Sequence, residues 1–596
     1  MPRMLVIGGA SLDVLHLKDR TVRCPGGAGL YTALAARRGG VAVDMFSPRP
    51  EPCPDELAPA AARLAAWLGP AIPPARLPRF EISYRQGRTE YLGVSLEAEQ
   101  ALSPDQLPGD LTAYDLVHVI SLKDASLQLD FLQACRQRGA RRLSAGTWPE
   151  EARAHPQRVR AVVEQVDYFF MNALEAGAVF GSPESARTQA GGVLFVTRGA
   201  QGVSIVQGET VTHLPGLPAN EFDPTGAGDS FCGAALAFLI QGAHPILAAR
   251  RAAALAAESI GQVGPQALLS DAPAPEIPLD GRVRIEAPRV ERVAARIAAL
   301  PEVAAFPFVA ATLPPVGHPR ALEFFFAATL QQFGFWTAHQ GRYDRPLLAR
   351  LGGTGRKGSD YLYDAMRRQI ERQPDFCTPE QQAQLDLGQL RLAFRSDDGQ
   401  DPMPALELHL EQARRYGRDM LALGLTPTGV LQAARQAPRP LQTFLSLLDR
   451  VGGYREDPLR KKSSLLALTL NQRPEGFLPL EEAEAVAPVI DYHAMRVFLR
   501  LGLVEVLDPA LQERLIARVE LTTEEEWAVR YAVYRAMGQL VACSGRSTGA
   551  VDQFVFANAR RHCLEMETPD CAGCPADLLC AHRTGYFQPV LRTSFY

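Results

Sequence analysis

Short apolar runs alternate with amphipathic stretches along the first 265 residues of the chain. The runs MLVIGG, YDLVHVIS, DYFFMN and GVLFVTRG are rich in β-branched and aromatic residues, and Ala-, Leu- and Arg-rich stretches separate them. This alternation predicts an α/β domain with a parallel sheet and helices on both of its faces. The segment 79–96 instead shows two strand patterns around RQGR. It predicts an antiparallel hairpin outside the main sheet.

Helical periodicity dominates the chain from residue 290 onward, as in ELHLEQARRYGRDMLALGL and EEEWAVRYAVYRAMGQLVA. This pattern predicts a second, all-α domain. Between the two regions, residues 271–289 contain four prolines and no helical period, which is typical of a linker. The expected parts are an α/β domain, a linker, an all-α domain and a cysteine-rich tail, at 1–270, 271–289, 290–556 and 557–596.

Length and charge narrow the classes of function. The 596 residues exceed the roughly 250 to 300 that one hydrophobic core supports, so at least two domains are expected. The net charge of −4 provides no overall basic field for nucleic acid, and no stretch approaches 18 uninterrupted apolar residues. We therefore expect a cytoplasmic protein with neither nucleic acid nor a membrane as its partner. The oligomeric state stays open.

The segment EFDPTGAGDSFCGAALAFLIQG, residues 221–242, carries the first chemical motif. Its small residues Gly226, Ala227 and Gly228 stand immediately before an apolar helix. Such a turn directs backbone N–H groups and the positive end of the helix dipole at one point, which suits a phosphate group. Asp229 follows at the start of the helix and is placed to take a proton from a substrate hydroxyl. An anion hole and an aligned base are what phosphoryl transfer requires.

DPTGAGDSF resembles the second signature of the PfkB (ribokinase-like) carbohydrate and nucleoside kinases. Other landmarks of that family follow in order between residue 4 and about 265: GGASLD, CPGGAGLYTALAARRGG, NALE and VTRGAQGV. The resemblance implies a ribokinase-like α/β fold with a small β lid, formed by the hairpin at 79–96. It also implies an ATP- and Mg²⁺-dependent transfer of phosphate to an alcohol group.

The same resemblance implies two sets of binding residues. The substrate set is Asp13, Gly26, Gly27, Tyr31 and Arg88. The nucleotide and magnesium set is Asn172, Glu175, Thr197, Gly199 and Gly202. Ribose-specific members carry asparagines in the Gly-Gly signature, where Ala28 and Tyr31 stand here. The sugar therefore stays open, and Tyr31 either stacks on a bulkier substrate or only packs.

Two further segments stand out in the second half. VIDYHAMRVFLRLGLVEV places Asp491 at the head of an amphipathic stretch, where it is either a helix cap or a functional carboxylate. About thirty residues earlier, Lys461 and Lys462 open another helix in YREDPLRKKSSLLALTL. Alone, this lysine pair would be a solvated run of charge.

The order of these segments resembles the queuosine salvage proteins, the queuosine 5'-phosphate N-glycosylases, in which an Asp-Tyr-Arg segment follows a Lys-Arg-Ala-Gln helix. EFFFAATLQQFGFW, KGSDYLYDAMRR, WAVRYAVYRAMGQL and VDQFVF, which contains Asp552, extend the similarity over about 320–556. The resemblance implies a catalytic Asp491, an active-site Lys461 and a base-binding neighbourhood of Phe335, Trp336 and Asp360. His493 and the pair Val555-Phe556 depart from the family pattern.

The cysteine tail, CLEMETPDCAGCPADLLC, has the spacing C-x7-C-x2-C-x5-C. It resembles the C-x6-C-x2-C-x5-C iron-sulfur loop of the endonuclease III and adenine glycosylase class of helix-hairpin-helix DNA glycosylases. The resemblance implies a helix-hairpin-helix glycosylase-like domain with a structural [4Fe-4S] cluster on Cys563, Cys571, Cys574 and Cys580. Zn²⁺ is the alternative, since four thiolates also make a closed zinc site.

Together these features predict a bifunctional enzyme. Its kinase would phosphorylate a nucleoside such as queuosine, and its N-glycosidase would split the 5'-phosphate into free base and ribose 5-phosphate. One alternative is a PfkB sugar or nucleoside kinase whose iron-sulfur α domain has no catalysis. The other is a DNA-repair glycosylase fused to a kinase, although neither an L-P-G-V-G hairpin nor a basic stripe supports it.

Overall fold

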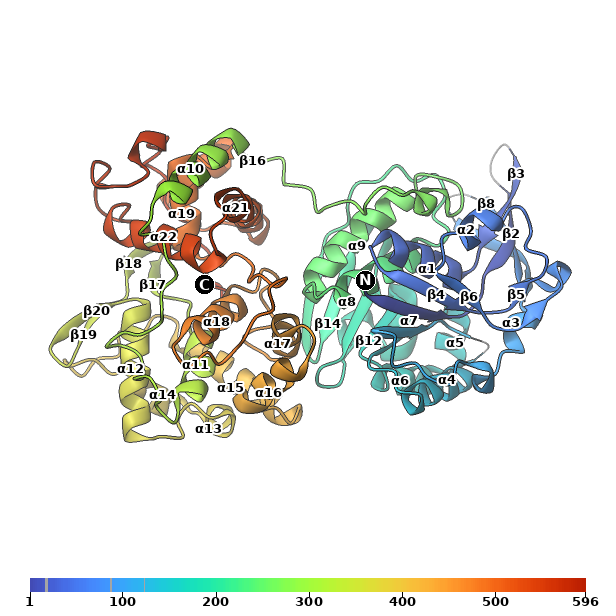
Figure 1. Ribbon diagram of the computed structural model, residues 1–596, viewed down its shortest axis with the longest axis horizontal. Helices are drawn as coiled ribbons and strands as arrows, with labels where there is room; N and C mark the ends of the chain where they lie inside the picture. The colour runs from blue at the N-terminus through green and yellow to red at the C-terminus, as the bar shows by residue number, and fades with distance from the viewer. Residues whose placement is uncertain (17–19, 86–87, 123) are drawn as a thin grey trace. The chain divides into compact units, whose positions relative to one another are not determined.

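The computed structural model describes residues 1–16, 20–85, 88–122 and 124–596. The side chains of residues 84–91, 97 and 100 lie outside this description. The chain folds into two compact units, Met1–Ile277 and Pro278–Tyr596 (Figure 1). Each unit has its own hydrophobic core and is described by itself.

The first unit is built on a nine-stranded sheet in the order β15-β14-β13-β12-β11-β10-β1-β4-β6. Its strands are β1 (Arg3–Ile7), β4 (Ala42–Phe46), β6 (Ala66–Leu68), β10 (Leu116–Val119), β11 (Leu143–Gly146), β12 (Tyr168–Asn172), β13 (Val193–Thr197), β14 (Val203–Gln207) and β15 (Thr210–Leu214). The prediction of a parallel sheet is wrong at one edge, where β14 and β15 run antiparallel. Their short connections cannot carry the crossover that parallel neighbours need.

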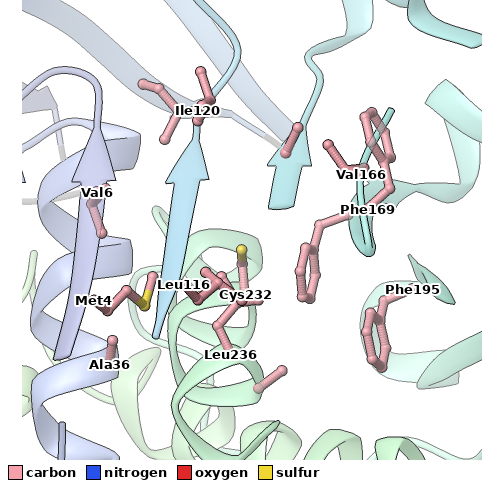
Figure 2. Close-up of a cluster of buried hydrophobic side chains, with 14 of the residues drawn as sticks. Met4, Val6, Ala36, Leu116, Ile120, Val166, Phe169, Phe195, Cys232 and Leu236 are labelled. Atoms are coloured by element: carbon pink, nitrogen blue, oxygen red, sulfur yellow. The ribbon is translucent and has the colours of Figure 1, made fainter. Parts of the chain in front are cut away.

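Helices cover both faces of this sheet, as its crossovers require. β4 lies on one side of β1 and β10 to β13 lie on the other, so right-handed connections place their helices on opposite faces. The helices packed together on one face are α1 (Ala28–Arg38), α8 (Ala227–Ile240) and α9 (Pro245–Ser259). The other face carries α4 (Ala125–Gln137), α5 (Pro149–Ala154), α6 (Pro156–Glu164) and α7 (Ala173–Phe180). Figure 2 shows Met4 and Leu116 of the sheet in the buried core with Leu236 of α8.

A second, four-stranded sheet stands beside the main one. Its order is β3-β2-β8-β9, with bounds Thr21–Gly26, Ser11–His16, Arg79–Arg85 and Arg88–Ser95. β8 and β9 form the antiparallel hairpin expected at 79–96, outside the main sheet. The remaining short elements of this unit include β5 (Arg49–Pro50), β7 (Ala71–Ile72), α2 (Ala58–Ala61) and α3 (Glu97–Gln100).

The second unit is mainly helical. Its helices are α10 (Ala287–Ala299), α11 (Ala321–Leu330), α12 (Ser359–Arg372), α13 (Pro379–Gln384), α14 (Leu387–Ala393), α15 (Leu406–Ala422), α16 (Pro427–Gln436), α17 (Pro440–Leu448), α18 (Lys461–Gln472), α19 (Tyr492–Leu501), α20 (Pro509–Ala517), α21 (Thr523–Ser544) and α22 (Thr548–Arg561). None of the helices in the described ranges has the length and apolar character to cross a membrane.

The expectation of an all-α unit is wrong in three small pairs of strands. They are β17 (Trp336–His339) with β18 (Arg342–Pro346), β19 (Leu348–Leu351) with β20 (Thr354–Lys357), and β16 (Val283–Ile285) with β21 (Val504–Val506). The pairing of β16 with β21 buries Val283 and places part of the expected 271–289 linker in the second unit. Helix α22 likewise runs through the expected boundary at 556.

Helices α1 and α8 cross so closely that a glycine is required between them. A Cβ atom on Gly233 would lie 2.0 Å from the carbonyl oxygen of Thr32. We expect Gly233→Ala to lower the free energy of unfolding of the first unit by about 1 to 3 kcal/mol, because the backbones must separate. Urea denaturation monitored by circular dichroism measures this change.

Gly177 is the matched control, because it lies inside α7 and a Cβ atom there would meet no atom within 4 Å. Gly177→Ala should raise stability by about 0.5 to 1 kcal/mol through the better helix propensity of alanine. Equal effects of the two substitutions would contradict the close approach of α1 and α8.

Candidate active sites

A cavity of about 440 Å³ lies at the carboxyl ends of the central strands of the first unit. Its walls include Gly9 after β1, Ile120 after β10, Gly146 at the end of β11 and Asn172 at the end of β12. The connections from β1 and β10 leave in opposite directions along the sheet. Ligand sites of open α/β sheets lie at such a switch point.

Asp229 stands in this cavity in the first turn of α8. Burial raises the pKa of its carboxyl group to about 6, so the group is ionised at neutral pH. The N–H of Ala227 already bonds the carbonyl of Pro224 at 3.2 Å, whereas within the described chain no backbone acceptor binds the N–H groups of Gly228 and Asp229. The free donors of the expected anion hole are therefore those of Gly228 and Asp229, and Ala227 does not line the cavity.

The turn at Gly226 packs tightly against the ring of Tyr31. Gly226 has φ of 71°, and a Cβ atom on it would lie 2.4 Å from the ring of Tyr31. The Tyr31 side chain is 2% exposed, although it also contributes to the cavity wall. Tyr31 therefore packs beneath the turn, and this contact requires glycine at position 226.

The Gly-Gly signature makes room for Asp13. A Cβ atom on Gly26 would lie 1.8 Å from Oδ2 of Asp13, and one on Gly27, whose φ is 93°, would lie 2.6 Å from the carbonyl oxygen of Gly9. The Asp13 carboxyl group accepts the N–H of Phe80 at 3.1 Å. Burial raises its pKa to about 6. Asp13 thus faces the cavity as a desolvated acceptor for a hydroxyl group.

Asn172 and Glu175 form a capping box at the start of α7. The side chain of Asn172 accepts the N–H of Glu175 at 2.9 Å, and Glu175 accepts the backbone N–H of Asn172 at 2.7 Å. Both residues line the cavity. Burial raises the pKa of Glu175 to about 7, with a smaller contribution from the charge of Asp229. The N-x-x-E spacing therefore holds α7 and presents a carboxyl group to the cavity.

Of the other expected nucleotide-binding residues, one lines the cavity and two lie outside it. Thr197 ends β13 and lines the cavity, while Gly199 and Gly202 do not. Gly202 has φ of 100°, and a Cβ atom there would lie 2.0 Å from the carbonyl oxygen of Leu214, so its glycine is required by the backbone. A Cβ atom on Gly199 would meet open space. The side chain of Arg88 lies outside the described residues.

Glu99 is a cavity residue that the sequence did not indicate. It follows the hairpin on the short α3 and lines the cavity beside Gly9. Burial raises its pKa to about 7, and the N–H of Gly9 donates a hydrogen bond to it. No motif marks this glutamate, because an acidic residue in EAEQ is typical of an exposed helix start. Only the folding of α3 over the cavity brings it into the site.

The second unit has a cavity of about 500 Å³ between α12, α18, α19 and α22. Lys461, Asp491 and Asp552 line it together, although up to 91 residues separate them in sequence. Phe335 and Asp360 line it as well. Aromatic side chains form much of the remaining wall: Phe306, Phe308, Tyr363, Tyr492 and Phe556.

The lysine and the two carboxyl groups of this cavity influence one another. Burial raises the pKa of Asp552 to about 8, and the charge of Asp491 adds to the effect. Burial lowers the pKa of Lys461 to about 8, against the opposing charges of Asp491 and Asp457. The ammonium group donates to the carbonyl of Gln332 at 2.8 Å, and Asp491 caps α19 by accepting the N–H of Ala494 at 2.9 Å. Asp491 is therefore both a helix cap and a cavity residue.

Trp336 is not part of this cavity. It begins β17, is 2% exposed, and packs against Tyr343 and Phe587 with ring centroids 5.7 and 5.3 Å away. Its neighbour Phe335 points to the other side because side chains alternate in extended chain. The expected base-binding group therefore loses Trp336.

Arg560 is a further cavity residue that the sequence analysis missed. Its guanidinium pairs with Asp360 at 2.6 Å and lies 5.4 Å from the centroid of Phe556. Asp552, Phe556 and Arg560 follow one another at intervals of four on α22, so they share one helix face. The four-residue spacing from Asp552 was the sequence signal that could have identified Arg560. Lys462, by contrast, is buried over the ring of Phe333 and is no surface charge.

The four tail cysteines meet at one small cavity of about 40 Å³. Cys563, Cys571, Cys574 and Cys580 all line it. The guanidinium of Arg500 donates to Sγ of Cys563 at 3.5 Å, and the N–H of His582 donates to Sγ of Cys580 at 3.3 Å. In the described chain, the compact group of potential metal ligands is Cys571, Asp577 and His582, whose ligand atoms lie within 4.8 Å of one another.

The raised pKa of Asp552 predicts a pH-dependent cost to stability. Between about pH 4 and 8 the folded chain retains a proton that the unfolded chain releases, so the free energy of unfolding falls as pH rises. Asp552→Asn removes this effect. We expect the variant to gain stability relative to the wild type progressively from pH 5 to pH 8, measured by urea denaturation. Glu513→Gln, at an exposed position of α20, is the control and should show a constant difference. A constant difference for Asp552→Asn as well would contradict the burial of its charge.

Comparison with known proteins finds a family match for part of the chain. Residues 90–272 match the model of the pfkB family carbohydrate kinases. A cytidine kinase of Thermococcus kodakarensis is 26% identical over 243 residues, which cover 39% of this chain and 87% of that kinase.

The solved structures that match part of the chain include a nucleoside kinase of Burkholderia thailandensis in complex with inosine. It is 19% identical and covers 46% of this chain and 94% of its own, with a TM-score of 0.38. A ribokinase of Thermotoga maritima is 20% identical and covers 45% of this chain and 96% of its own, with a TM-score of 0.37. The family match covers Asn172, Glu175 and Asp229 and supports a kinase of the pfkB type, a phosphotransferase, in residues 90–272.

Proposed function

We propose that this protein is a bifunctional nucleoside salvage enzyme. The first unit phosphorylates a nucleoside at its 5'-hydroxyl group with ATP, and the second unit hydrolyses the nucleoside 5'-phosphate to free base and ribose 5-phosphate. The observation that carries the second step is the convergence of Lys461, Asp491 and Asp552 in one aromatic-lined cavity. The product of the first reaction is the substrate of the second.

In the kinase step, Asp229 accepts the proton of the attacking hydroxyl group as that oxygen bonds to the γ-phosphorus of ATP and the bond to ADP breaks. Its pKa of about 6 suits a base at neutral pH. The N–H groups of Gly228 and Asp229 at the head of α8 face the charge that develops on the phosphoryl oxygens. Asp13 and Glu99 hold the nucleoside through its hydrogen-bond donors.

Glu175 and Asn172 are the residues that would hold Mg²⁺ with the ATP phosphates. They fit the ion, because carboxylate and amide oxygens are its preferred protein ligands and both side chains face the cavity. When bound, Mg²⁺ neutralises phosphate charge. Burial raises the pKa of Glu175 to about 7, and a neighbouring cation would favour the ionised form.

In the glycosidase step, the bond between C1' and the base breaks with its electron pair passing to the base. Asp552, protonated at neutral pH by its pKa of about 8, gives its proton to the departing base. The carboxylate of Asp491 stabilises the positive charge on C1'. Water then bonds to C1' and its proton restores Asp552. Lys461 provides a buried cation for the 5'-phosphate, and the aromatic rings hold the base.

Queuosine is the substrate we favour, because the second half resembles the queuosine 5'-phosphate N-glycosylases. A nucleoside substrate for the first unit agrees with its similarity to a cytidine kinase. The alternative of a kinase with a non-catalytic second unit gives no reason for a desolvated lysine and two carboxyl groups in one cavity. The sequence shows no basic stripe that would support a DNA-repair glycosylase.

The cysteine tail would hold a [4Fe-4S] cluster through Cys563, Cys571, Cys574 and Cys580. The four residues fit it, since they surround one cavity and two of the sulfurs accept N–H donors. A single tetrahedral Zn²⁺ ion needs sulfurs about 3.8 Å apart. No three of these cysteine sulfurs, all within the described chain, lie within 4.8 Å of one another. When bound, the cluster cross-links the tail.

The proposal predicts that free base appears from queuosine only when ATP and Mg²⁺ are present. Mass spectrometry of nucleoside, nucleotide and base over time measures both steps. Asp229→Ala should lower phosphorylation by about 10²- to 10⁴-fold, because it removes the base. Queuosine 5'-phosphate should then restore base release. Asp491→Asn should block base release and leave phosphorylation intact.

Asp386→Asn is the matched control for Asp491→Asn, because Asp386 also caps a helix, α14, but lies outside the cavity. It should leave both steps unchanged. Consumption of ATP with no base released from any 5'-nucleotide would refute the glycosidase and leave a kinase with a helical appendage.

The cluster proposal predicts about four iron atoms and four acid-labile sulfides in each chain purified without oxygen. Cys574→Ser should lose iron and lower the unfolding temperature of the second unit, because the tail loses its cross-link. Cys543→Ser, at an exposed cysteine on α21, is the control and should keep both. Zinc in place of iron would overturn the cluster assignment.

A further inference from the structure

His493 is a buried imidazole on the wall of the second cavity. It stands in the first turn of α19, is 7% exposed, and lines the cavity with Asp491. Its ring lies 4.2 Å from that of Tyr492 and 5.3 Å, edge to face, from that of Phe556, measured between centroids. This is the aromatic part of the cavity, which suits a flat heterocycle.

The hydrogen bond between Arg496 and His493 fixes the imidazole tautomer. Nη2 of Arg496 lies 3.1 Å from Nδ1 of His493. A guanidinium can only donate, so Nδ1 is the acceptor and the proton of the neutral ring is on Nε2. Nε2 has no hydrogen-bond partner among the described residues. Because His493 lines the cavity and its Nε2 atom is not fully buried, this N–H donor is open to a ligand.

Hydrogen bonds and an ion pair hold the Arg496 side chain in this position. It is fully buried and donates to the carbonyl groups of Cys563 and Ala559 at 3.1 and 3.3 Å. It also donates to Oε1 of Gln588 at 2.9 Å and pairs with Glu565 at 3.4 Å. These partners come from the end of α22 and the tail. The chain beside the first tail cysteine thus helps to hold the imidazole in one state.

The surroundings of His493 keep its ring neutral. Burial lowers its pKa well below the usual value, and four cations near it, Arg496, Arg560, Lys357 and Lys461, oppose a further positive charge. The carboxylates near the ring have other partners: Glu565 pairs with Lys357 and Arg496, and Asp491 accepts the N–H of Ala494. A neutral donor suits a neutral acceptor, whereas the phosphate of a nucleotide is better served by the cationic Lys461.

We propose that His493, held as its Nε2–H tautomer by Arg496, is a specificity residue that donates a hydrogen bond to a carbonyl oxygen of the departing base. The inference deepens the proposed glycosidase step and rests on it for its ligand. A base with an amino group at this place would face His493 donor to donor, leaving both N–H groups unpaired in a dry site. The second unit therefore selects oxo-bases, and Arg496 is a positioning residue.

The tautomer is tested first, because this measurement does not depend on enzymatic activity. The full-length protein, labelled with ¹⁵N in its histidine rings, is followed by long-range ¹H–¹⁵N spectra between pH 5.5 and 8, and the signal missing in His493→Gln assigns the residue. We expect an unprotonated Nδ1 and a protonated Nε2 throughout. A protonated Nδ1, or titration to imidazolium in this range, would overturn the proposal. Arg496→Met should release the tautomer, and Arg496→Lys, which retains a donor, should preserve it.

The ligand is tested with queuosine, guanosine and adenosine 5'-phosphates as probes. His493→Phe should lower kcat/KM for base release from the oxo-base nucleotides by about 10- to 100-fold, while His493→Gln, which retains an N–H donor, should restore much of it. Preference for the adenosine nucleotide, or equal loss in both variants, would refute the donor role. If the wild type releases no base at all, the glycosidase fails, while the spectra still decide the tautomer.

Discussion

Carboxyl groups that are buried without a salt-bridge partner among the described residues determine the chemistry available to both units. Desolvation disfavours their charged form, so Asp13, Glu99, Glu175, Asp229 and Asp552 all have raised pKa values. Backbone N–H groups hold the first three in place. These groups need a cavity beside them that can hold water or a ligand. If side chains filled either cavity, a buried polar group would lose its hydrogen-bond partner, at a cost in free energy.

A buried ion pair of the second unit has a structural role instead. Asp457 and Arg530 are at most 1% exposed and lie 2.7 Å apart, and Asp457 also accepts the N–H of Lys461 at 2.7 Å. This pair fixes the start of α18, from which Lys461 enters the cavity. The structural carboxylate Asp457 thus pairs with an arginine, whereas no arginine in the described part of the chain pairs with Asp552 in the cavity. The contrast separates the structural charges of this unit from those available to a ligand.

Helices α19 and α22 connect the cysteine tail to the second cavity. α19 begins at the Asp491 cap, and its later residue Arg500 donates to the carbonyl of Leu564 at 2.7 Å and to Sγ of Cys563. α22 carries Asp552 and leads directly into Cys563. Lys357, the last residue of β20, pairs with Glu565 at 2.6 Å. The tail is therefore packed against the elements that bear the cavity residues, and fixing it fixes them.

Local sequence was enough to predict the alternating α/β pattern, the hairpin at 79–96, the turn before α8 and the cysteine motif, because each depends on neighbours within a few residues. Local pattern could not reveal that β14 pairs antiparallel with both β13 and β15, or that Glu99 folds over a cavity. It also could not reveal that Trp336 lies outside the second cavity while its neighbour Phe335 lines it. It also could not show that Arg496 replaces solvent as the partner of His493. Those outcomes depend on contacts between segments far apart in the chain, where burial decides which polar groups are paired and which face a ligand.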